Sequence, residues 1–510
     1  MAYLYGSSIQ GIQSFIFETN KLREIVGASE IVDNLSGNFF KEKFKLNSPD
    51  FIMHAAGNIK LVLEDRDLLA EIVRAWPKIV QEKAPGLTLS QAVVTLDGDL
   101  TQDHIMRLEE KLKTQRNKGG GLRPLAAMAM VRSRRTGHPA VDWKDEQSAP
   151  RDLAVRAKQE VGKGEALHSL MEKSFPSDIT KSIKSLPMDV SDITGKGETG
   201  WLAVIHADGN GLGKVIQSMA GQMAGQPSEM RRVFKEFSGA LDQATINAAR
   251  ASVKEIILPE VKGEGDDSEH TVKLPFRPVL LGGDDLTVII RADLALDFTR
   301  SFLNHFENET AERMAELSKQ YGLAILEKGL TSCAGIAFMK ESYPFHYAAD
   351  LAEELSAYAK KVSREVKAGR MPSSLAFHKI QDSFVDSYED ITERELTAGD
   401  ISFRYGPYFI NNEYLPSVET LENQVNAILK KEAPLSGLRN WLALLYDDPT
   451  RAELWLDRVC KITREKAPKE DFVGKLGLME AVKDNKTHLY DVLSMASLMR
   501  GAITGGENHG

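Results

Sequence analysis

The sequence predicts an α+β fold in which one structural unit occurs twice and is followed by a bundle of helices. Three observations support this prediction. Short apolar runs alternate with longer stretches of helical spacing, the order β-α-β-β-α recurs after residue 199, and the pattern is purely helical from about residue 417. The chain has 510 residues, more than a single hydrophobic core usually serves, so three or four units are expected.

The first unit is expected over residues 1–135, beginning with a strand at 3–9. The next stretch has helical spacing to about residue 45, with a break expected near Gly27. Two apolar runs flank Ala56-Gly57-Asn58, which indicates a hairpin within 51–64 because Gly and Asn tolerate the positive φ of tight turns. The remaining elements are a helix at 66–83, a strand at 89–98, a helix at 102–117 and a strand at 124–132. The order β-α-β-β-α-β is that of a ferredoxin-like unit.

Residues 136–198 are polar and contain several prolines, so they are expected to form a connector with one or two short helices. The second unit, residues 199–395, repeats the order of the first. Residues 396–510 are expected to form a C-terminal helical domain, because apolar residues recur there at helical spacing. The elements expected in the second unit are a strand at 201–208, a helix at 228–253, a hairpin at 277–290, a helix at 293–320, a strand at 330–338, a helix at 345–365 and a strand at 374–380.

The charge balance restricts the partners. The net charge is −9, so the surface as a whole repels nucleic-acid phosphates, and RNA binding would need a local basic patch. Residues 111–135 hold eight lysines and arginines around Gly119-Gly120-Gly121 and could supply that patch. A solvated helix end and loop is the favoured interpretation, because no aromatic residue is interleaved to stack on bases.

Cysteine usage and hydropathy point to the cytoplasm. Cys333 and Cys460 lie far apart, and the chain has no CxxC motif, which argues against a structural zinc site and a disulfide framework. The N-terminus lacks a basic start with a long apolar run, and no stretch of about 20 apolar residues follows. We therefore expect a cytoplasmic protein that makes no use of a membrane.

Two carboxylates stand where burial would make them costly. In LLGGDDLTVII, Asp284 and Asp285 occupy the tip of a hairpin between apolar strands, an unfavourable place for charge unless cations neutralise it. Gly282 and Gly283 allow the tight turn and leave room for a triphosphate. A GGDD tetrapeptide is often an ordinary turn, and EGDD at 264–267, in a polar loop, is interpreted as one. The apolar flanks of the first motif favour a functional site.

A third acid is predicted to join this pair. In AVIHADGNGLGK a hydrophobic strand ends in Asp208, and in a βαββ unit this strand lies beside the hairpin. Asp208 can therefore meet Asp284 and Asp285 across adjacent strands, giving the oxygen ligands that Mg²⁺ or Mn²⁺ prefers. Two such ions, about 4 Å apart, would activate a hydroxyl and stabilise the leaving pyrophosphate. The three aspartates are predicted to be both metal ligands and catalytic residues.

The glycine-rich turn after this strand is predicted to bind phosphate. Its backbone N–H groups can face phosphate oxygens, and a lysine at its end can add a positive charge. Lys360, in a predicted helix, could hold the end of the triphosphate, with a solvated helix lysine as an equal alternative. The run GNGLGK matches neither the P-loop nor the dinucleotide fingerprint. The predicted nucleotide contacts are Gly209, Asn210, Gly211, Gly213 and Lys214, together with Gly282, Gly283 and Lys360.

These residues resemble the large subunit of type III CRISPR systems, the Cas-ten/Cmr-two family, whose palm domains are related to GGDEF cyclases and to polymerases. The likeness covers the N-terminal YLYGSSIQGIQSFIFETNKLREIVGASEIVDN, DGNGLGK, GGDD, TSCAGIAF, the helix ending in AKK and the helical C-terminus. It implies two palms packed as a pseudo-dimer, with ATP converted to cyclic oligoadenylate messengers at the second. By motif match, Asp208, Asp284 and Asp285 would be metal ligands, and Ser332 and Lys360 would lie near the nucleotide.

The chain also departs from that family. The first palm has Ala56-Gly57-Asn58 where acids would be, so it is expected to be catalytically inert, although it can still wall the substrate pocket. The chain begins at the first palm and has no His-Asp dipeptide, so the DNA-cutting HD nuclease of many members is not expected. The connector reads RSRRTGHPAV, without cysteine, where the family often carries a zinc module. Asn210 replaces the usual second acid and leaves a neutral ligand.

Three functions remain open. The favoured one is an enzyme that converts ATP or another nucleoside triphosphate into a cyclic oligonucleotide or dinucleotide with release of pyrophosphate, in antiviral defence. The second is a non-catalytic or RNA-activated large subunit of a CRISPR ribonucleoprotein, in which residues 111–135 contact guide or target RNA or a neighbouring subunit. A templated polymerase is least favoured, because the acidic chain lacks an evident basic groove. Ring size, linkage, base, activating signal and oligomeric state, including a homo-oligomer, are left open.

Overall fold

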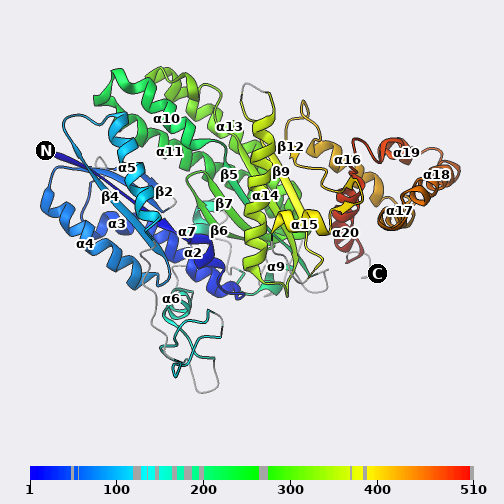
Figure 1. The fold of residues 1–510 in the computed structure, drawn as a ribbon, viewed down its shortest axis with the longest axis horizontal. Helices are drawn as coiled ribbons and strands as arrows, with labels where there is room; N and C mark the ends of the chain where they lie inside the picture. Colours follow the sequence, from blue (N-terminus) through cyan, green and yellow to red (C-terminus); the bar gives the residue numbers. More distant parts are fainter. Residues whose placement is uncertain are drawn as a thin grey trace.

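The computed structural model contains a first sheet with its helices, a second sheet with longer helices, and a group of C-terminal helices at the end of the molecule away from the first sheet (Figure 1). This mixture confirms the predicted α+β class. None of the described helices combines the length and apolar character needed to span a bilayer. The structure describes residues 1–47, 51–55, 57–118, 128–134, 136–143, 149–162, 169–176, 187–194, 200–262, 274–367, 370–382 and 387–505.

The first sheet has the strand order β2-β3-β1-β4, with antiparallel pairing throughout. This is the order of a ferredoxin-like unit, as predicted. Side-chain caps begin two of its helices: Asp65 accepts main-chain N–H groups at the start of α4, and Thr101 and His104 form a capping box at α5. The elements are β1 (Ala2–Gln10), α1 (Ile12–Phe17), α2 (Leu22–Ser36), α3 (Asn38–Lys43), β2 (Phe51–Ala55), β3 (Asn58–Leu63), α4 (Arg66–Lys83), β4 (Thr88–Leu96) and α5 (Gln102–Arg116).

The strand expected at 124–132 is not seen in the described residues. Residues 119–127 lie outside them, Met128 and the next two residues form a turn and a bend, and Arg132 makes only an isolated bridge with Pro139. The sheet is complete without this strand, because β4 already occupies the outer position beside β1. Much of the basic segment at 111–135, and the EGDD run at 264–267, also lie outside the described residues.

The helix break expected at Gly27 is wrong. Helix α2 runs without interruption through Gly27, and the break lies between α1 and α2. A Cβ added at Gly27 would lie 1.9 Å from the main-chain oxygen of Lys158. Glycine is therefore used for the close approach of α6 (Leu153–Val161), which packs along α2.

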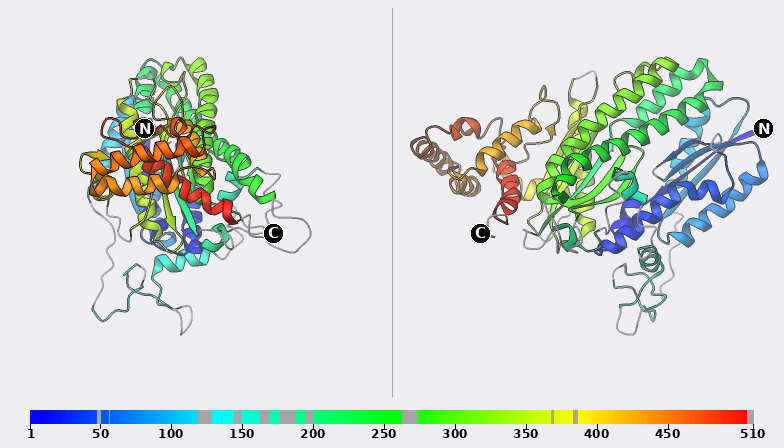
Figure 2. Two further views of the ribbon diagram at one scale, coloured as in Figure 1. Left: turned by 90° about the vertical axis from the view of Figure 1, so that its right-hand side faces the viewer. Right: turned by 180° about the vertical axis from the view of Figure 1, so that it is seen from behind.

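The second sheet has the order β12-β9-β8-β5-β7-β6, and its last four strands repeat the antiparallel order of the first sheet. Strand β9 adds to β8 in parallel. Helices α11 and α13 run side by side along this unit (Figure 2). A Cβ at Gly335 would lie 2.0 Å from the oxygen of Ala352, so α14 packs directly on β8. The elements are β5 (Trp201–Gly209), α10 (Leu212–Gln222), α11 (Pro227–Ser252), β6 (Phe276–Gly282), β7 (Asp285–Arg291), α13 (Ala295–Tyr321), β8 (Ser332–Lys340), α14 (Phe345–Glu365) and β9 (Ser374–Lys379).

The two units pack through matching elements. Helix α2 of the first unit lies against β6, the edge strand of the second sheet, and the Ser29 hydroxyl donates to the carbonyl of Val279. Helix α11 of the second unit lies in turn against β2, the edge strand of the first sheet. Connector helices close one side of this junction, where Phe175 contacts Phe276 with ring centroids 6.0 Å apart. The described connector helices are α6, α7 (Ser169–Ser174) and α9 (Val190–Thr194), where one or two were expected.

The C-terminal part begins with short strands that the pattern did not predict. Strand β12 (Tyr408–Phe409) pairs with β9, so the second sheet continues past residue 395. Helices follow from Val418, as the predicted bundle requires. The further elements are α15 (Tyr388–Arg394), β10 (Thr397–Ala398), β11 (Ile401–Ser402), α16 (Val418–Leu429), α17 (Leu435–Asp447), α18 (Pro449–Lys466), α19 (Phe472–Lys475) and α20 (Leu489–Gly505).

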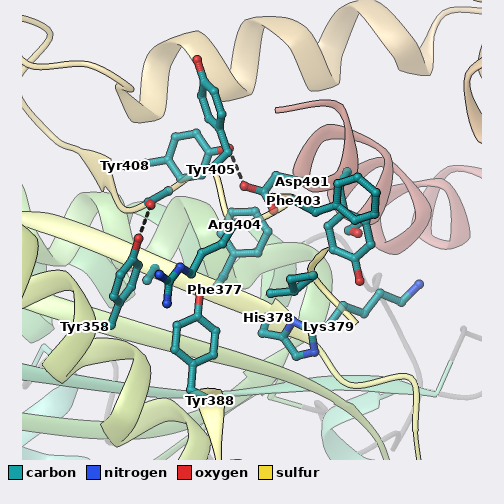
Figure 3. A pocket seen from close by; sticks show the side chains of 15 residues that line it. Tyr358, Phe377, His378, Lys379, Tyr388, Phe403, Arg404, Tyr405, Tyr408 and Asp491 are labelled. Atoms are coloured by element: carbon teal, nitrogen blue, oxygen red, sulfur yellow. Dashed lines mark hydrogen bonds between the residues drawn. The ribbon is translucent and has the colours of Figure 1, made fainter. Parts of the chain in front are cut away.

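An aromatic cluster joins the C-terminal helices to the second sheet (Figure 3). Within it, the Tyr408 hydroxyl donates to the Asp491 carboxylate at 2.7 Å, and the Tyr358 hydroxyl donates to the Gly406 carbonyl at 2.6 Å. The cavity between these side chains is only about 20 Å³, room for about one water. Burial raises the pKa of Asp491 to about 7. The cluster is a packed junction and not a ligand site.

Candidate metal and nucleotide site

Three carboxylates meet at one end of the second sheet. Asp208 lies near the end of β5, Asp284 in the β6–β7 turn and Asp285 at the start of β7. One ligand oxygen from each lies within 4.8 Å of the others, the only such group of three or more His, Cys, Asp or Glu side chains in the described part of the chain. The sequence analysis expected these side chains to meet, and they do. Their role as metal ligands stays a prediction.

Burial and mutual repulsion disfavour the ionised forms of these carboxylates. Burial, and then the charge of Asp208, raises the pKa of Asp284 to about 6. Burial, and then the charges of Asp284 and Asp208, raises the pKa of Asp285 well above its usual range. Both shifts mean that ionised carboxylates are disfavoured here without a neutralising cation. Oxygen ligands at this spacing fit Mg²⁺ or Mn²⁺.

Lys360 is the cation that the structure places at this site. Its ammonium group binds the Asp208 carboxylate and donates to the main-chain oxygen of Gly209 at 2.9 Å. Helix α14 carries Lys360 to this position, since Gly335 lets the helix lie directly on β8. One ammonium faces three carboxylates, so negative charge remains for metal ions.

Two glycines fix the geometry of the carboxylates. A Cβ at Gly209 would lie 2.7 Å from Oδ2 of Asp284, so only glycine lets Asp284 lie across the end of β5. Gly283 has φ +64°, in the left-handed region that favours glycine, and it turns the chain between β6 and β7. Gly282 pairs with Asp285 across that turn. These positions serve the turn itself, as predicted for the two turn glycines.

Two side chains of helix α11 form hydrogen bonds with the β6–β7 turn, which the sequence analysis did not predict. The Gly283 N–H donates to Oδ1 of Asp242 at 2.9 Å, and the Thr245 hydroxyl donates to the Gly283 carbonyl at 2.6 Å. Both main-chain polar groups of Gly283 are thereby fixed. The available signal was the placing of these two polar residues, one helical turn apart, next to the buried apolar face of α11.

The predicted phosphate loop is a short connection into α10. Gly211, with φ +67°, is the N-cap of α10, and the exposed Lys214 lies in its first turn. Asn210 is buried: its N–H donates to the Thr331 carbonyl at 2.8 Å, and its Nδ2 donates to the Thr331 hydroxyl at 2.9 Å. Oδ1 of Asn210 is buried without a hydrogen-bond partner. A Cβ at Gly213 would meet nothing within 4 Å. Asn210 thus anchors the loop.

Ser332 and His206 lie in the floor of the site. Ser332 is fully buried, and its hydroxyl donates to the carbonyl of Asp208 at 3.0 Å, so it supports the end of β5 from below. His206, which the sequence analysis missed, lies 3.1 Å from the Thr287 hydroxyl and 3.4 Å from Nε2 of Gln13 in the first unit. Burial lowers the pKa of His206 to about 4, so it is neutral near pH 7.

The segment that holds the site matches a known family model. Residues 201–367 match the family model described as Cas10/Cmr2, second palm domain. This range contains β5, the β6–β7 hairpin and α14, and therefore all three carboxylates and Lys360. A search of curated proteins found no match to the chain.

Solved structures match over nearly the whole chain. A Csm1–Csm4 cassette in complex with pppApApA matches with a TM-score of 0.57 and 15% identity, over 98% of this chain and 69% of that chain. The cassette in complex with cA4 matches with a TM-score of 0.52 and 15% identity, over 98% and 70%. Csm1 from T. onnurineus matches with a TM-score of 0.55 and 14% identity, over 98% and 69%. The predicted resemblance is confirmed: residues 201–367 match the second palm domain of Cas10/Cmr2, and the chain has the fold of Csm1.

Proposed function

We propose that this chain is a metal-dependent nucleotidyltransferase that joins ATP into a cyclic oligoadenylate messenger with release of pyrophosphate, in antiviral defence. The observation that carries the proposal is the convergence of Asp208, Asp284 and Asp285 in a second palm domain. Carboxylates are costly at this half-buried turn, and a cation-dependent reaction gives a reason for their presence. Related structures hold pppApApA, cA4 or one ATP, which supports an adenine nucleotide as the substrate.

The residues of the site have distinct roles in this proposal. Two Mg²⁺ or Mn²⁺ ions, held by the three aspartates, would supply activation of a ribose hydroxyl and neutralisation of the leaving pyrophosphate. Lys360 already lies against Asp208, and its ammonium can turn to a triphosphate oxygen when the aspartate binds metal. Asn210 and Gly211 shape the loop into α10, whose first turn offers N–H groups and Lys214 to phosphate. Asp242 and Thr245 keep the turn in place.

Incubation of purified protein with each nucleoside triphosphate and Mg²⁺ or Mn²⁺ tests this function, with products identified by mass spectrometry. We expect a cyclic adenylate product and pyrophosphate from the wild type. The Asp284→Ala/Asp285→Ala variant should make neither. Product of equal amount from that variant would rule out the proposed site.

The alternative is a subunit that needs RNA, or that does not catalyse. The Asp208–Lys360 ion pair favours an activated enzyme, because it must open before both groups can serve metal and nucleotide. Partner subunits of the type III complex and guide or target RNA would then supply activation, in the cytoplasm. Adding the complex and its target RNA distinguishes the cases: product only with RNA identifies an activated enzyme, and no product in any mixture identifies a scaffold.

A further inference from the structure

Helix α14 is held on two flanks at the level of the carboxylates. On one flank the ammonium of Lys360 binds Asp208 and donates to the main-chain oxygen of Gly209 at 2.9 Å. Tyr358 lies two residues earlier, and its hydroxyl donates to the Gly406 carbonyl at 2.6 Å (Figure 3). Residues two apart in an α-helix lie about 200° apart around its axis, so the two contacts hold one turn of α14 from opposite sides.

A segment of the chain, residues 403–409, supplies the acceptor on the second flank and is itself fixed to the C-terminal helices. The Phe403 ring stacks on the Tyr490 ring of α20, with centroids 5.7 Å apart and an angle of 10° between the ring planes. The Tyr408 hydroxyl donates to the carboxylate of Asp491, also on α20, at 2.7 Å. Direct contacts therefore lead from α20 through this segment to α14.

Contacts beneath α14 set its distance from the sheet, and the flank contacts set its rotation. A Cβ at Gly335 would lie 2.0 Å from the Ala352 oxygen and 2.6 Å from the Ser356 nitrogen, so this part of the helix lies directly on β8. Further along, the Ser363 hydroxyl lies 2.7 Å from the hydroxyl of Ser374 on β9. The two flank contacts act across this face, and they resist rotation of the intervening turn about the helix axis.

We propose that Tyr358 is a positioning residue, which holds Lys360 against Asp208 and links this ion pair to the position of the C-terminal helices. The inference rests on the proposed function, in which Lys360 meets the triphosphate and Asp208 binds metal. When the Tyr358 contact is lost, Lys360 leaves Asp208 more readily and the carboxylate is freer to bind a cation. A triphosphate then loses a positive group that was already aligned. A displacement of α20 would reach the carboxylates by this route.

Chemical labelling of Lys360 tests the positioning without metal or nucleotide. Acetylation of the full-length protein by a limiting amount of an amine-reactive ester, followed by peptide mass spectrometry, measures how readily the ammonium group leaves its partner. The Lys360 side chain is 13% exposed and paired, so it should react slowly in the wild type. In Tyr358→Phe, which keeps the ring, it should react about threefold faster. The exposed Lys319 on α13 should react equally in both proteins and is the internal reference.

Binding measurements read the same change at the site. The Mn²⁺ affinity of Tyr358→Phe, from electron paramagnetic resonance, should rise about threefold, because the ammonium competes less with the metal. At saturating Mn²⁺, the affinity for α,β-methylene ATP, which cannot release pyrophosphate, should fall about threefold. General destabilisation would instead lower both affinities. Lys360→Met should show the largest change in each direction, and Tyr358→Phe/Lys360→Met should equal Lys360→Met, because Tyr358 acts through Lys360.

A matched control removes a tyrosine hydroxyl that joins two other helices. The Tyr321 hydroxyl at the end of α13 donates to the Glu236 carboxylate on α11 at 2.8 Å, and Tyr321→Phe should change neither the Lys360 labelling rate nor either affinity. An equal Lys360 rate in wild type and Tyr358→Phe would overturn the proposal, as would the same change in Tyr321→Phe. Faster Lys360 labelling in a protein that binds no nucleotide analogue would support the positioning and count against the proposed function.

Discussion

The two sheets of this chain share one strand order but differ at the tip of one hairpin. In the first sheet Ala55 pairs with Asn58, and Asn58 pairs with Ser8. In the second sheet Gly282 pairs with Asp285, and the pairing of Ala207 with Leu286 sets Asp208 beside Asp285. The positions in the first sheet that correspond to Asp208, Asp284 and Asp285 are therefore Ser8, Gly57 and Asn58, in that order.

The difference shows that the fold does not need the acids. The first tip closes with ordinary backbone pairing, in which the Ile9 N–H donates to the Gly57 carbonyl at 2.9 Å. The second tip closes around carboxylates whose pKa values are raised by burial and mutual repulsion. Since the same topology forms without that cost, the acids of the second tip are best explained by function.

The largest effect is expected when the second tip is made more like the first. Asp285→Asn should reduce cyclic product on the order of a thousandfold, because the proposed metal ligand loses its charge. The metal-free variant should also melt at a higher temperature than the wild type, because a repelling buried carboxylate is removed. Product analysis and thermal melting without metal measure the two effects. A lower melting temperature would mean that Asp285 is a structural residue.

The next effect concerns the glycine beneath Asp284. Gly209→Ala should lower product on the order of a hundredfold. The added Cβ would lie 2.7 Å from Oδ2 of Asp284 and would therefore displace this carboxylate. Gly239→Ala on α11 is the matched control, since its Cβ meets nothing within 4 Å and its exposed helical position favours alanine. Mn²⁺ affinity and product yield should fall only in the first variant. Equal loss in both would show that the loss does not come from the contact with Asp284.

A smaller effect is expected from the support behind the turn. Thr245→Val keeps the shape but leaves the Gly283 carbonyl without its donor, at a cost of about 1–3 kcal/mol in stability. Thr299→Val on α13 is the control, because that buried hydroxyl bonds only within its own helix, to the Ala295 carbonyl. Denaturant unfolding should separate the two variants. A similar free energy of unfolding for both would show that the hydrogen bond from Thr245 to Gly283 adds no stability beyond that of a hydroxyl bonded within its own helix.

The carboxylates of the second tip should also make the stability of the protein depend on pH. The pKa of Asp284 is about 6 in the folded protein against an ordinary 3.8, so the folded state keeps a proton that the unfolded chain releases. The free energy of unfolding of the metal-free protein should therefore fall as pH rises from about 4 to about 6. Asp284→Asn should flatten this slope relative to wild type. An identical slope in both proteins would contradict the assigned pKa shift.

The smallest effect is expected from the reverse exchange. Asn58→Asp puts one acid at the first tip, where Ser8 and Gly57 offer no second carboxylate. We expect no additional Mn²⁺ bound, measured by electron paramagnetic resonance, and a stability change within about 1 kcal/mol. An additional bound ion would show that the first palm retains a metal site.

Sequence patterns predicted most of the fold because its signals are local. The hairpin around Gly283 and the strand ending in Asp208 could be recognised from apolar runs and turn residues alone. Gly27 could not be interpreted correctly, because its role depends on Lys158, more than a hundred residues away. Strand β12 was missed because two residues carry no periodicity.

The candidate site shows the same division. The three aspartates were predictable, since each follows or opens an apolar strand and the topology sets them side by side. Asp242 and Thr245 were not, because polar residues on a long helix rarely bond to a distant turn. Ser332 was assigned to the nucleotide by resemblance, whereas its hydroxyl supports the Asp208 carbonyl.

The pairing of β12 with β9 decides where this protein can be divided. A fragment that ends at residue 395 would lose β12 and leave the backbone groups of Ser374 and Leu375, at the start of β9, without these pairing partners. An uncovered strand edge is a template for another chain, so such a fragment should aggregate through its second sheet. A fragment that extends past Phe409 keeps these pairs. It is therefore the shortest fragment of this kind that we expect to stay monomeric in solution.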